Sequence, residues 1–397
     1  MRIMHIAPSA TYNEGWSYQE NLLPKYQQQL GHDVCLVVTN REHRGGQTVE
    51  VECSDKIERD GFRVIRRNVQ LTIVKPLTNF LSTIDVWSLL VHYKPDMVFY
   101  HGLGTSTMKQ VIQYKRKLAP QLVIVQDNHL DYNIGFNPYT AKGRVLRYIA
   151  RSLQKPYNKY VSRFYGVTPW RKKYAIEVFG TPADRTDVLI MGADDEKIKF
   201  SQREEIRQGI RKKYGISDDE FLIVTGGRLD KRKKTHLLMQ AVNQVKGVKL
   251  IVFGNVLEDI KEEFDSQLSE QVQWIGFISA DDSYDYFLAA DLVVFPGQHS
   301  VLWEQACACK TPCVFGRWDG MDHVNNGGNA DFLEDVSVEG LVKMICELRW
   351  TEKYETMKQA ALSDLTDVFL YSGIARKSLE TMHDCETLKY TTMKEKT

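Results

Sequence analysis

The chain has 397 residues, of which 43% are hydrophobic and 26% are charged, as in a globular protein with more than one domain. No apolar run reaches the length of a membrane helix, and the first residues read as a short strand without the apolar core of a signal peptide. The seven cysteines are scattered and odd in number, which favours a reducing compartment over a disulfide framework. We therefore expect a cytoplasmic protein.

The net charge is +1, but it is distributed unevenly. Residues 1–195 contain 26 Lys and Arg against 18 Asp and Glu, a balance of +8, so the remainder carries −7. A basic first half could face anionic lipid headgroups at the inner face of a membrane, or an acceptor that carries phosphate. The alternative is an ordinary solvated surface. We expect no nucleic-acid partner.

In the first half, short apolar strands alternate with helical patterns. Strands are expected at residues 3–6, 34–39, 62–66, 97–100, 122–126, 164–168 and 188–190. Helices are expected at 17–30 and from Pro169 onward. This alternation predicts a parallel sheet that is covered on both faces.

A polar segment, Met191 to Ser201, is interpreted as the linker between two domains. A helix over 202–214 opens the second half, and the alternation then repeats. Strands are expected at 221–225, 249–253, 272–275, 292–295 and 313–315. The sequence therefore predicts two doubly wound domains with a cleft between them, and ligands at the carboxyl ends of the strands.

The most informative stretch runs from Phe295 to Val314. A strand ends at Pro296-Gly297, and a helix is expected from Val301 to Lys310, with Ser300 as its cap. A helix N-terminus behind a glycine loop suits an anion, and Glu304 in the first turn can accept hydrogen bonds from sugar hydroxyls. An anion with hydroxyls attached describes a nucleotide diphosphate sugar.

A second stretch, from Ile223 to Lys234, also leads from a short apolar strand into glycines. Its loop carries Arg228 and Lys233, and a guanidinium fork and an ammonium group both suit phosphate oxygens. The alternative is a solvated basic turn, but the strand and Gly227 before it favour a phosphate-binding loop.

Together these stretches resemble the family-4 glycosyltransferases of the GT-B fold. The family pattern G-R-L, with a lysine five positions after the arginine, is matched by Gly227-Arg228-Leu229 and Lys233. The family's glutamate at the helix start is matched by Glu304, followed by Gln305-Ala306. The family's first glutamate is replaced by Pro296, and this departure concerns how the transferred sugar is held.

The resemblance implies an α/β fold of the GT-B class, in which two doubly wound, Rossmann-like domains face a central cleft. An N-terminal domain, 1–195, would bind the acceptor. A C-terminal domain, 196–374, would bind the nucleotide sugar. A last helix, about 375–397, would return to the N-terminal domain.

The resemblance also implies roles for single residues. Arg228 and Lys233 would bind the donor diphosphate and His129 would face the transferred sugar, so these three are the candidate catalytic residues. His129 could instead be a loop histidine satisfied by a neighbouring aspartate. His101, also after a strand, and Glu14 are the candidates for the acceptor. The donor-binding candidates besides Arg228 and Lys233 are Gly15, Gly227, Phe277, Ile278, Gly297, Ser300, Val301 and Glu304.

We expect neither a metal nor another cofactor, because the resembled family usually works without metal. Cys307, Cys309 and Cys313 are interpreted as small buried apolar residues, since the first two point to different faces of one short helix. The segment His101-Gly102-Leu103-Gly104 lacks the third glycine of a nicotinamide-binding loop.

The predicted activity is the transfer of a sugar, with retention, from a nucleotide diphosphate sugar to a hydroxyl of a glycan or lipid-linked acceptor. The leaving phosphate would take the acceptor proton, since no pair of carboxylates suits a double displacement. Two alternatives stay open. One is a nucleotide-sugar epimerase or hydrolase, and the other is a non-catalytic protein that binds sugar nucleotides.

Overall fold

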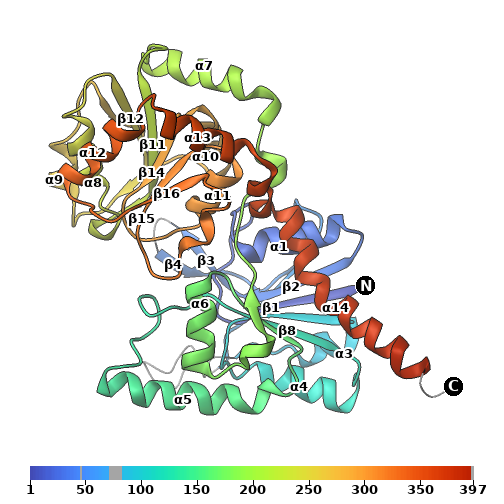
Figure 1. Ribbon diagram of the computed structural model, residues 1–397. Helices are drawn as coiled ribbons and strands as arrows, with labels where there is room; N and C mark the ends of the chain where they lie inside the picture. The colour runs from blue at the N-terminus through green and yellow to red at the C-terminus, as the bar shows by residue number, and fades with distance from the viewer. Residues whose placement is uncertain (45–46, 71–82, 395–397) are drawn as a thin grey trace. The chain divides into compact units, whose positions relative to one another are not determined.

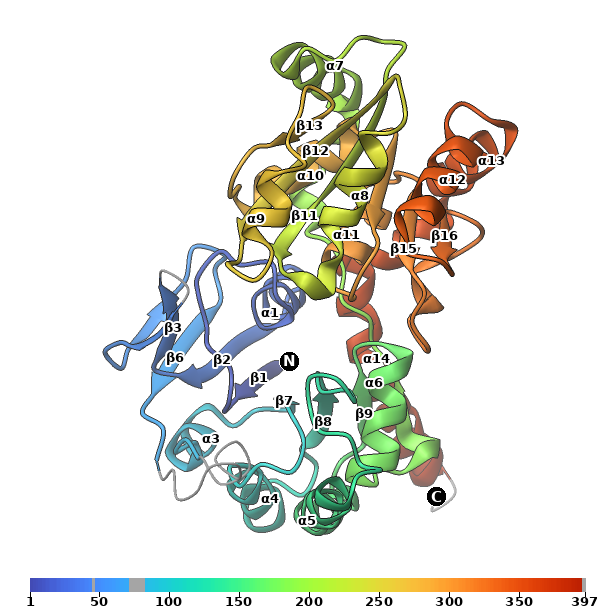
Figure 2. The same cartoon turned by 90° about the vertical axis from the view of Figure 1, so that its left-hand side faces the viewer.

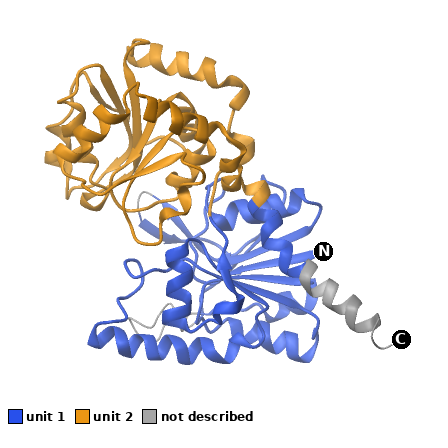
Figure 3. Ribbon diagram, viewed as in Figure 1, with its two compact units in different colours: residues 1–190, 374–397 blue, residues 191–373 orange. Residues whose placement is uncertain are grey.

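The computed structural model describes residues 1–44, 47–70 and 83–394, with side chains up to Met382. It contains two compact units, one of residues 1–190 with 374–397 and one of residues 191–373 (Figure 3). Each unit has a largely parallel sheet with helices around it, so the predicted α/β class with two Rossmann-like units is confirmed. The end of the predicted last helix, 395–397, lies outside the described residues.

Unit 1 is built on an eight-stranded sheet in the order β10-β9-β8-β7-β1-β2-β6-β5 (Figure 1). All neighbours are parallel except β5 and β6. The strands are β1 Arg2–Ala7, β2 Asp33–Thr39, β5 Asp55–Ile57, β6 Arg63–Arg67, β7 Met97–His101, β8 Val123–Asn128, β9 Arg163–Gly166 and β10 Thr186–Val188. A separate antiparallel hairpin pairs β3 Arg41–Arg44 with β4 Gln47–Glu50.

Helices surround this sheet, as Figure 2 shows for α3, α4 and α5. Every residue of β7 and of β8 is buried, as expected for strands in the middle of a sheet that is covered on both faces. The helices of this unit are α1 Gln19–Gln29, α3 Trp87–Tyr93, α4 Met108–Lys117, α5 Ala141–Asn158, α6 Pro169–Tyr174, and α14 Tyr371–Lys394 from residue 374 onward.

Unit 2 has a six-stranded parallel sheet in the order β13-β12-β11-β14-β15-β16. The chain winds outward from β11 in one direction and then from β14 in the other, so the strand order reverses between these two strands. In sheets of this kind, ligands bind beyond the carboxyl ends of the strands at that reversal. The strands are β11 Phe221–Leu229, β12 Val248–Val256, β13 Val272–Trp274, β14 Leu292–Phe295, β15 Cys313–Gly316 and β16 Ala330–Leu333.

The helices of unit 2 are mostly short: α7 precedes the strands in sequence, α8 to α11 lie between them, and α12 and α13 follow them. They are α7 Arg203–Tyr214, α8 Thr235–Val242, α9 Lys261–Asp265, α10 Ala280–Ala289, α11 Leu302–Ala308, α12 Val338–Leu348 and α13 Glu352–Leu362. The sequence did not predict β16, because a strand of four residues is too short to stand out.

The predicted linker, Met191 to Ser201, begins where the chain passes from unit 1 to unit 2, but the segment itself is packed into unit 2. Ala193 is fully buried and pairs with Leu370, and the amide of Asp194 donates to the hydroxyl of Tyr284 at 3.0 Å. Backbone groups that are buried in this way need partners, and here unit 2 supplies them. The segment is therefore an anchored part of unit 2, although its composition is polar.

Two glycines let β11 and β12 approach closely at their carboxyl ends. Gly254 has a φ of 118°, and a Cβ added there would lie 1.8 Å from the carbonyl oxygen of Gly227. No side chain can be accommodated at that distance, so this end of the sheet depends on glycine.

We predict that Gly254→Ala lowers the free energy of unfolding by about 2–5 kcal/mol, because the new methyl group meets backbone at a strained φ. The matched control is Gly209→Ala in α7, where an added Cβ meets nothing within 4 Å. In an exposed helix interior that change should add roughly 0.5–1 kcal/mol. Urea unfolding of both variants checks the pair, and equal stabilities would contradict the close approach.

Candidate active site

The first group of candidate residues lies at the carboxyl ends of β11 and β14 in unit 2. β11 extends through Gly227 and Arg228 to Leu229 and pairs with β12 along its length. Arg228 is therefore on a strand, where the sequence predicted a loop. Its side chain is 67% exposed, and its Nε lies 3.8 Å from the carboxylate of Asp230. The guanidinium is thus open to a ligand.

Lys233 joins the turn after β11 to the loop after β14. Its Nζ donates to the carbonyl oxygens of Gln298 at 2.6 Å and His299 at 3.2 Å, and the Gln298 amide donates back to the Arg232 carbonyl at 3.0 Å. A Cβ on Gly297 would lie 2.2 Å from that same Arg232 carbonyl, so the contact needs glycine. Burial lowers the pKa of the Lys233 ammonium to about 8.

Glu304, in the first turn of α11, is fully buried between two histidines. Its Oε1 accepts hydrogen bonds from Nε2 of His299 at 2.9 Å and Nε2 of His323 at 2.8 Å. Its Oε2 is buried without a hydrogen-bond partner. Burial raises the pKa of the Glu304 carboxyl, but the two histidines more than offset this and bring it to about 2. The group is an ionised carboxylate with one unoccupied acceptor oxygen.

His299, Glu304 and His323 also stand close enough to hold a metal ion, since their ligand atoms lie within 4.8 Å of one another. A metal on Nε2 would require the proton of His323 to move to Nδ1. That atom is buried and has no partner, so the proton would be left unsatisfied. Hydrogen bonding from both histidines therefore fits the cluster better than a metal.

The helix that carries Glu304 is shorter than predicted. α11 begins at Leu302, its N-cap residue is Val301, and no side chain caps it. The predicted cap at Ser300 is wrong: its carbonyl accepts a hydrogen bond from the amide of Trp303 at 3.0 Å. The helix ends before Lys310, which has a φ of 55°. The three cysteines of this region are buried free thiols: Cys307, Cys309 and Cys313.

The remaining donor candidates, Phe277 and Ile278, have few contacts that bear on a role. Phe277 is 72% exposed and Ile278 half-buried, in the loop between β13 and α10. This loop reaches β12, because the Gly254 amide donates to the Gly276 carbonyl at 2.7 Å. A role in holding a base stays a prediction.

Two candidates of unit 1 occupy the turn before α1. Gly15 has a φ of 77°, which favours glycine, and Glu14 accepts a hydrogen bond from the Arg59 amide at 2.9 Å. Nothing in these contacts assigns Gly15 to the donor or Glu14 to an acceptor, so both stay predictions.

A chain of buried hydrogen bonds crosses unit 1 from β8 to α14. Nδ1 of His101 lies 2.8 Å from Asp127, Nε2 of His101 lies 3.0 Å from Nδ1 of His5, and Nε2 of His5 lies 2.7 Å from Oε1 of Gln27. Gln27 then donates to the hydroxyl of Ser378 at 2.9 Å. Of these residues, the sequence singled out only His101.

The far end of this chain fixes the direction of its bonds as far as His5. The hydroxyl of Ser378 donates to the carbonyl of Ala375 at 2.6 Å, so it accepts from Gln27. The oxygen of Gln27 therefore faces His5, whose Nε2 donates to it. Burial, together with the neighbouring His101, lowers the pKa of His5 to about 3, so this ring is neutral at pH 7.

His129 shares the carboxylate of Asp127. Its Nε2 lies 3.3 Å from Oδ2 of Asp127, so the alternative of a histidine satisfied by this neighbour is observed. Its side chain is nevertheless 31% exposed. Burial lowers the pKa of His129, but the charge of Asp127 outweighs it and the net shift is upward. The imidazole is thus held on one side and open on the other.

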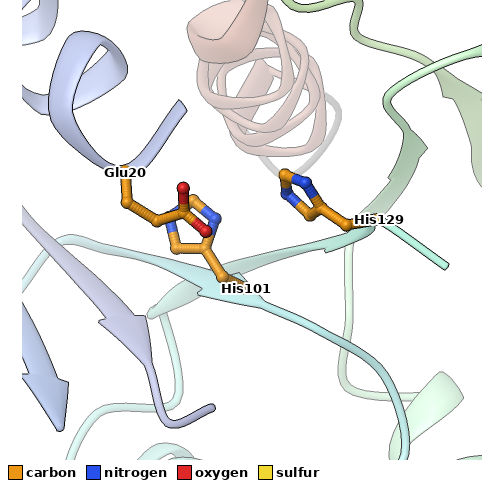
Figure 4. Close-up of side chains that lie close together, drawn as sticks. All are labelled: Glu20, His101 and His129. Carbon is orange, nitrogen blue, oxygen red and sulfur yellow. The ribbon is translucent and has the colours of Figure 1, made fainter. Parts of the chain in front are cut away.

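Glu20, which the sequence did not single out, lies beside His101 and His129 in unit 1. It stands in the first turn of α1, and its carboxylate lies within 4.8 Å of ligand nitrogens of His101 and His129 (Figure 4). Both nitrogens of His101 are already engaged, so a metal there would break the buried chain. The signal available in the sequence was only an acid at the start of the first helix.

We predict that Asp127→Asn lowers the free energy of unfolding by about 1–3 kcal/mol, because His101 and His129 lose the buried carboxylate oxygen that they share. Urea unfolding measures the loss. The control is Asp184→Asn, at an exposed aspartate of the same unit, which should leave the unfolding curve unchanged.

The direction of the chain is checked separately by the ¹⁵N shifts of labelled histidine. At pH 7, His5 should give the pattern of a neutral ring that is protonated at Nε2. A proton on Nδ1 of His5 would contradict the direction of the hydrogen-bond chain.

Comparison with known proteins adds the family. Residues 206–362 match the glycosyl transferases group 1. An uncharacterized glycosyltransferase of Methanocaldococcus jannaschii is 26% identical over 159 residues, or 38% of this chain and 41% of that protein. The mannosylfructose-phosphate synthase of Agrobacterium fabrum is 24% identical over 232 residues, or 53% of this chain and 50% of that protein. The chain thus spans about half the length of the curated relatives that it matches.

Solved structures extend the likeness to the whole chain. HepE of Anabaena, in complex with UDP and glucose, superposes with a TM-score of 0.64 at 18% identity, over 97% of this chain and 100% of that one. At this identity the likeness shows the fold. Residues 206–362 of this chain are therefore similar to the group 1 glycosyl transferases, and the chain has the GT-B fold.

Proposed function

We propose that this protein transfers a sugar from a nucleotide diphosphate sugar to a hydroxyl of a glycan or lipid-linked acceptor. One observation carries the proposal: Arg228 and Lys233 lie with the loop at 297–299 where the strand order of unit 2 reverses. Sheets of this kind bind ligands there, and these groups suit a diphosphate. The descriptions of two similar proteins agree with such a donor: one is a mannosylfructose-phosphate synthase, and the other was crystallised with UDP and glucose.

The reaction places negative charge on the leaving nucleotide as the bond from sugar to phosphate breaks. The exposed guanidinium of Arg228 and the third N–H of Lys233 would stabilise that charge. These fixed cations supply what a metal ion supplies elsewhere, so we propose a reaction without a metal.

Glu304 would hold the ribose of the donor through its Oε2. This oxygen is closed off in the described conformation, so a hydroxyl reaches it after the loop that carries His299 moves aside. His323 would continue to hold Oε1 and keep the carboxylate aimed. Glu304 would therefore bind the ribose only after this loop has moved.

In unit 1, the open side of His129 would contact the transferred sugar, with Glu20 beside it. We propose retention of configuration, with the leaving phosphate taking the proton of the acceptor hydroxyl. The setting would be polysaccharide or lipid-linked glycan synthesis in the cytoplasm.

We predict that Arg228→Ala lowers kcat/KM about 10²–10³-fold, as the loss of one transition-state donor does elsewhere. The side chain is exposed, so thermal unfolding should not change. The control is Lys231→Ala, an exposed cation of the same turn. Transfer is measured as nucleotide release over a panel of donors and acceptors, and near-normal turnover of Arg228→Ala would remove the donor site from this place.

We also predict that affinity for a nucleoside diphosphate falls as pH rises above 8. Lys233 carries its charge below its lowered pKa of about 8 and loses it above. A bound anion retains that proton, so the affinity should fall up to about tenfold per pH unit. In Lys233→Arg the charge persists, and the slope should disappear. Titration calorimetry at pH 7, 8 and 9 checks both proteins, and equal slopes would contradict the assignment.

A further inference from the structure

The α4–α5 face of unit 1, formed by the exposed sides of these two helices, has no role in the proposed reaction. Both helices lie side by side along one edge of the unit in Figures 1 and 2. Between Tyr132 and Ile176, a stretch that contains α5, the chain has ten Lys and Arg and no Asp or Glu. α4 likewise carries cations and no acid.

One stripe along α5 changes in character from apolar to cationic. Val145, Tyr148, Ser152, Lys155 and Lys159 follow one another at spacings of three or four, which places them on one face of the helix. Val145 is 60% and Tyr148 75% exposed. Large apolar side chains that are exposed next to cations are typical of helices that lie in a membrane interface.

The cationic end of the stripe opens into a hollow between α4 and α5. Its volume is about 1080 Å³, and it is lined by Lys109, Arg116, Lys117, Lys155 and Lys159. No acidic side chain lines it. None of the five cations forms an ion pair with a residue that the structure describes. A cavity with five uncompensated charges attracts anions.

We propose that the α4–α5 face docks on a membrane surface that contains anionic lipids. Val145 and Tyr148 enter the boundary between headgroups and acyl chains, and lipid phosphates occupy the hollow. Among residues 1–44, 47–70 and 83–394, no helix has the length and apolar character of a membrane span, so the contact is peripheral.

Other occupants fit this face less well. A second copy of the chain would set the five cations against themselves in a two-fold interface. A nucleic acid would use the cations but not Val145 and Tyr148. Glu177, the acid at which the acid-free stretch ends, does not line the hollow.

The test is co-sedimentation of the full chain with vesicles of phosphatidylcholine, alone or with 30% phosphatidylglycerol. The protein should bind the anionic vesicles, and 0.5 M NaCl should weaken binding, since the attraction is screened. Lys155→Glu with Lys159→Glu should lower the partition coefficient at least about twenty-fold, as about 1 kcal/mol per cation implies. Val145→Ser with Tyr148→Ser should lower it as well.

The matched control is Lys212→Glu with Lys213→Glu on exposed α7 positions of unit 2, which should bind like the unchanged protein. Equal binding to both vesicle types, or by the Lys155/Lys159 variant, overturns the proposal. Two further results would also overturn it. One is a dimer that the unchanged protein forms and the Lys155/Lys159 variant does not. The other is stabilisation of the protein by inorganic phosphate without any binding to vesicles. Nucleotide affinity is measured alongside, so failure here is distinct from failure of the transferase assignment.

Discussion

A single ammonium group, that of Lys233, organises the candidate donor site. Its two hydrogen bonds tie the turn after β11 to the loop after β14, at the place where the sheet of unit 2 reverses its winding. Gly297 and Gly254 make the close approaches there possible. Burial lowers the pKa of the Lys233 ammonium, so a bound anion would favour the protonated form of the group that joins the two loops.

The sequence predicted those parts of the site that depend on residues close together in the chain. A strand, glycines and a cation follow one another directly at Gly227-Arg228, and the short apolar strands could be read from their patterns. The sequence-based predictions fail where a local sequence pattern is compatible with more than one structure. Ser300 is a good capping residue in isolation, but the chain enters α11 two residues later. The segment at 191–201 reads as a linker, although contacts with distant residues anchor it.

The polar partners of the site could not be predicted, because they come from far along the chain. His323 reaches Glu304 from nineteen positions away, and Ser378 reaches Gln27 across 351 positions. No periodicity marks such pairs. Glu304 in unit 2 and Asp127 in unit 1 nevertheless share one principle: each is a buried carboxylate that is kept ionised by two imidazoles.

The involvement of Ser378 has a consequence for how the protein is made. Helix α1 is synthesised well before helix α14, since the acceptor for the amide of Gln27 lies 351 positions further along the chain. Until α14 is made, the amide must remain solvated, because burying it unpaired would be costly. The histidine centre of unit 1 therefore reaches its final form only after α14 has been synthesised.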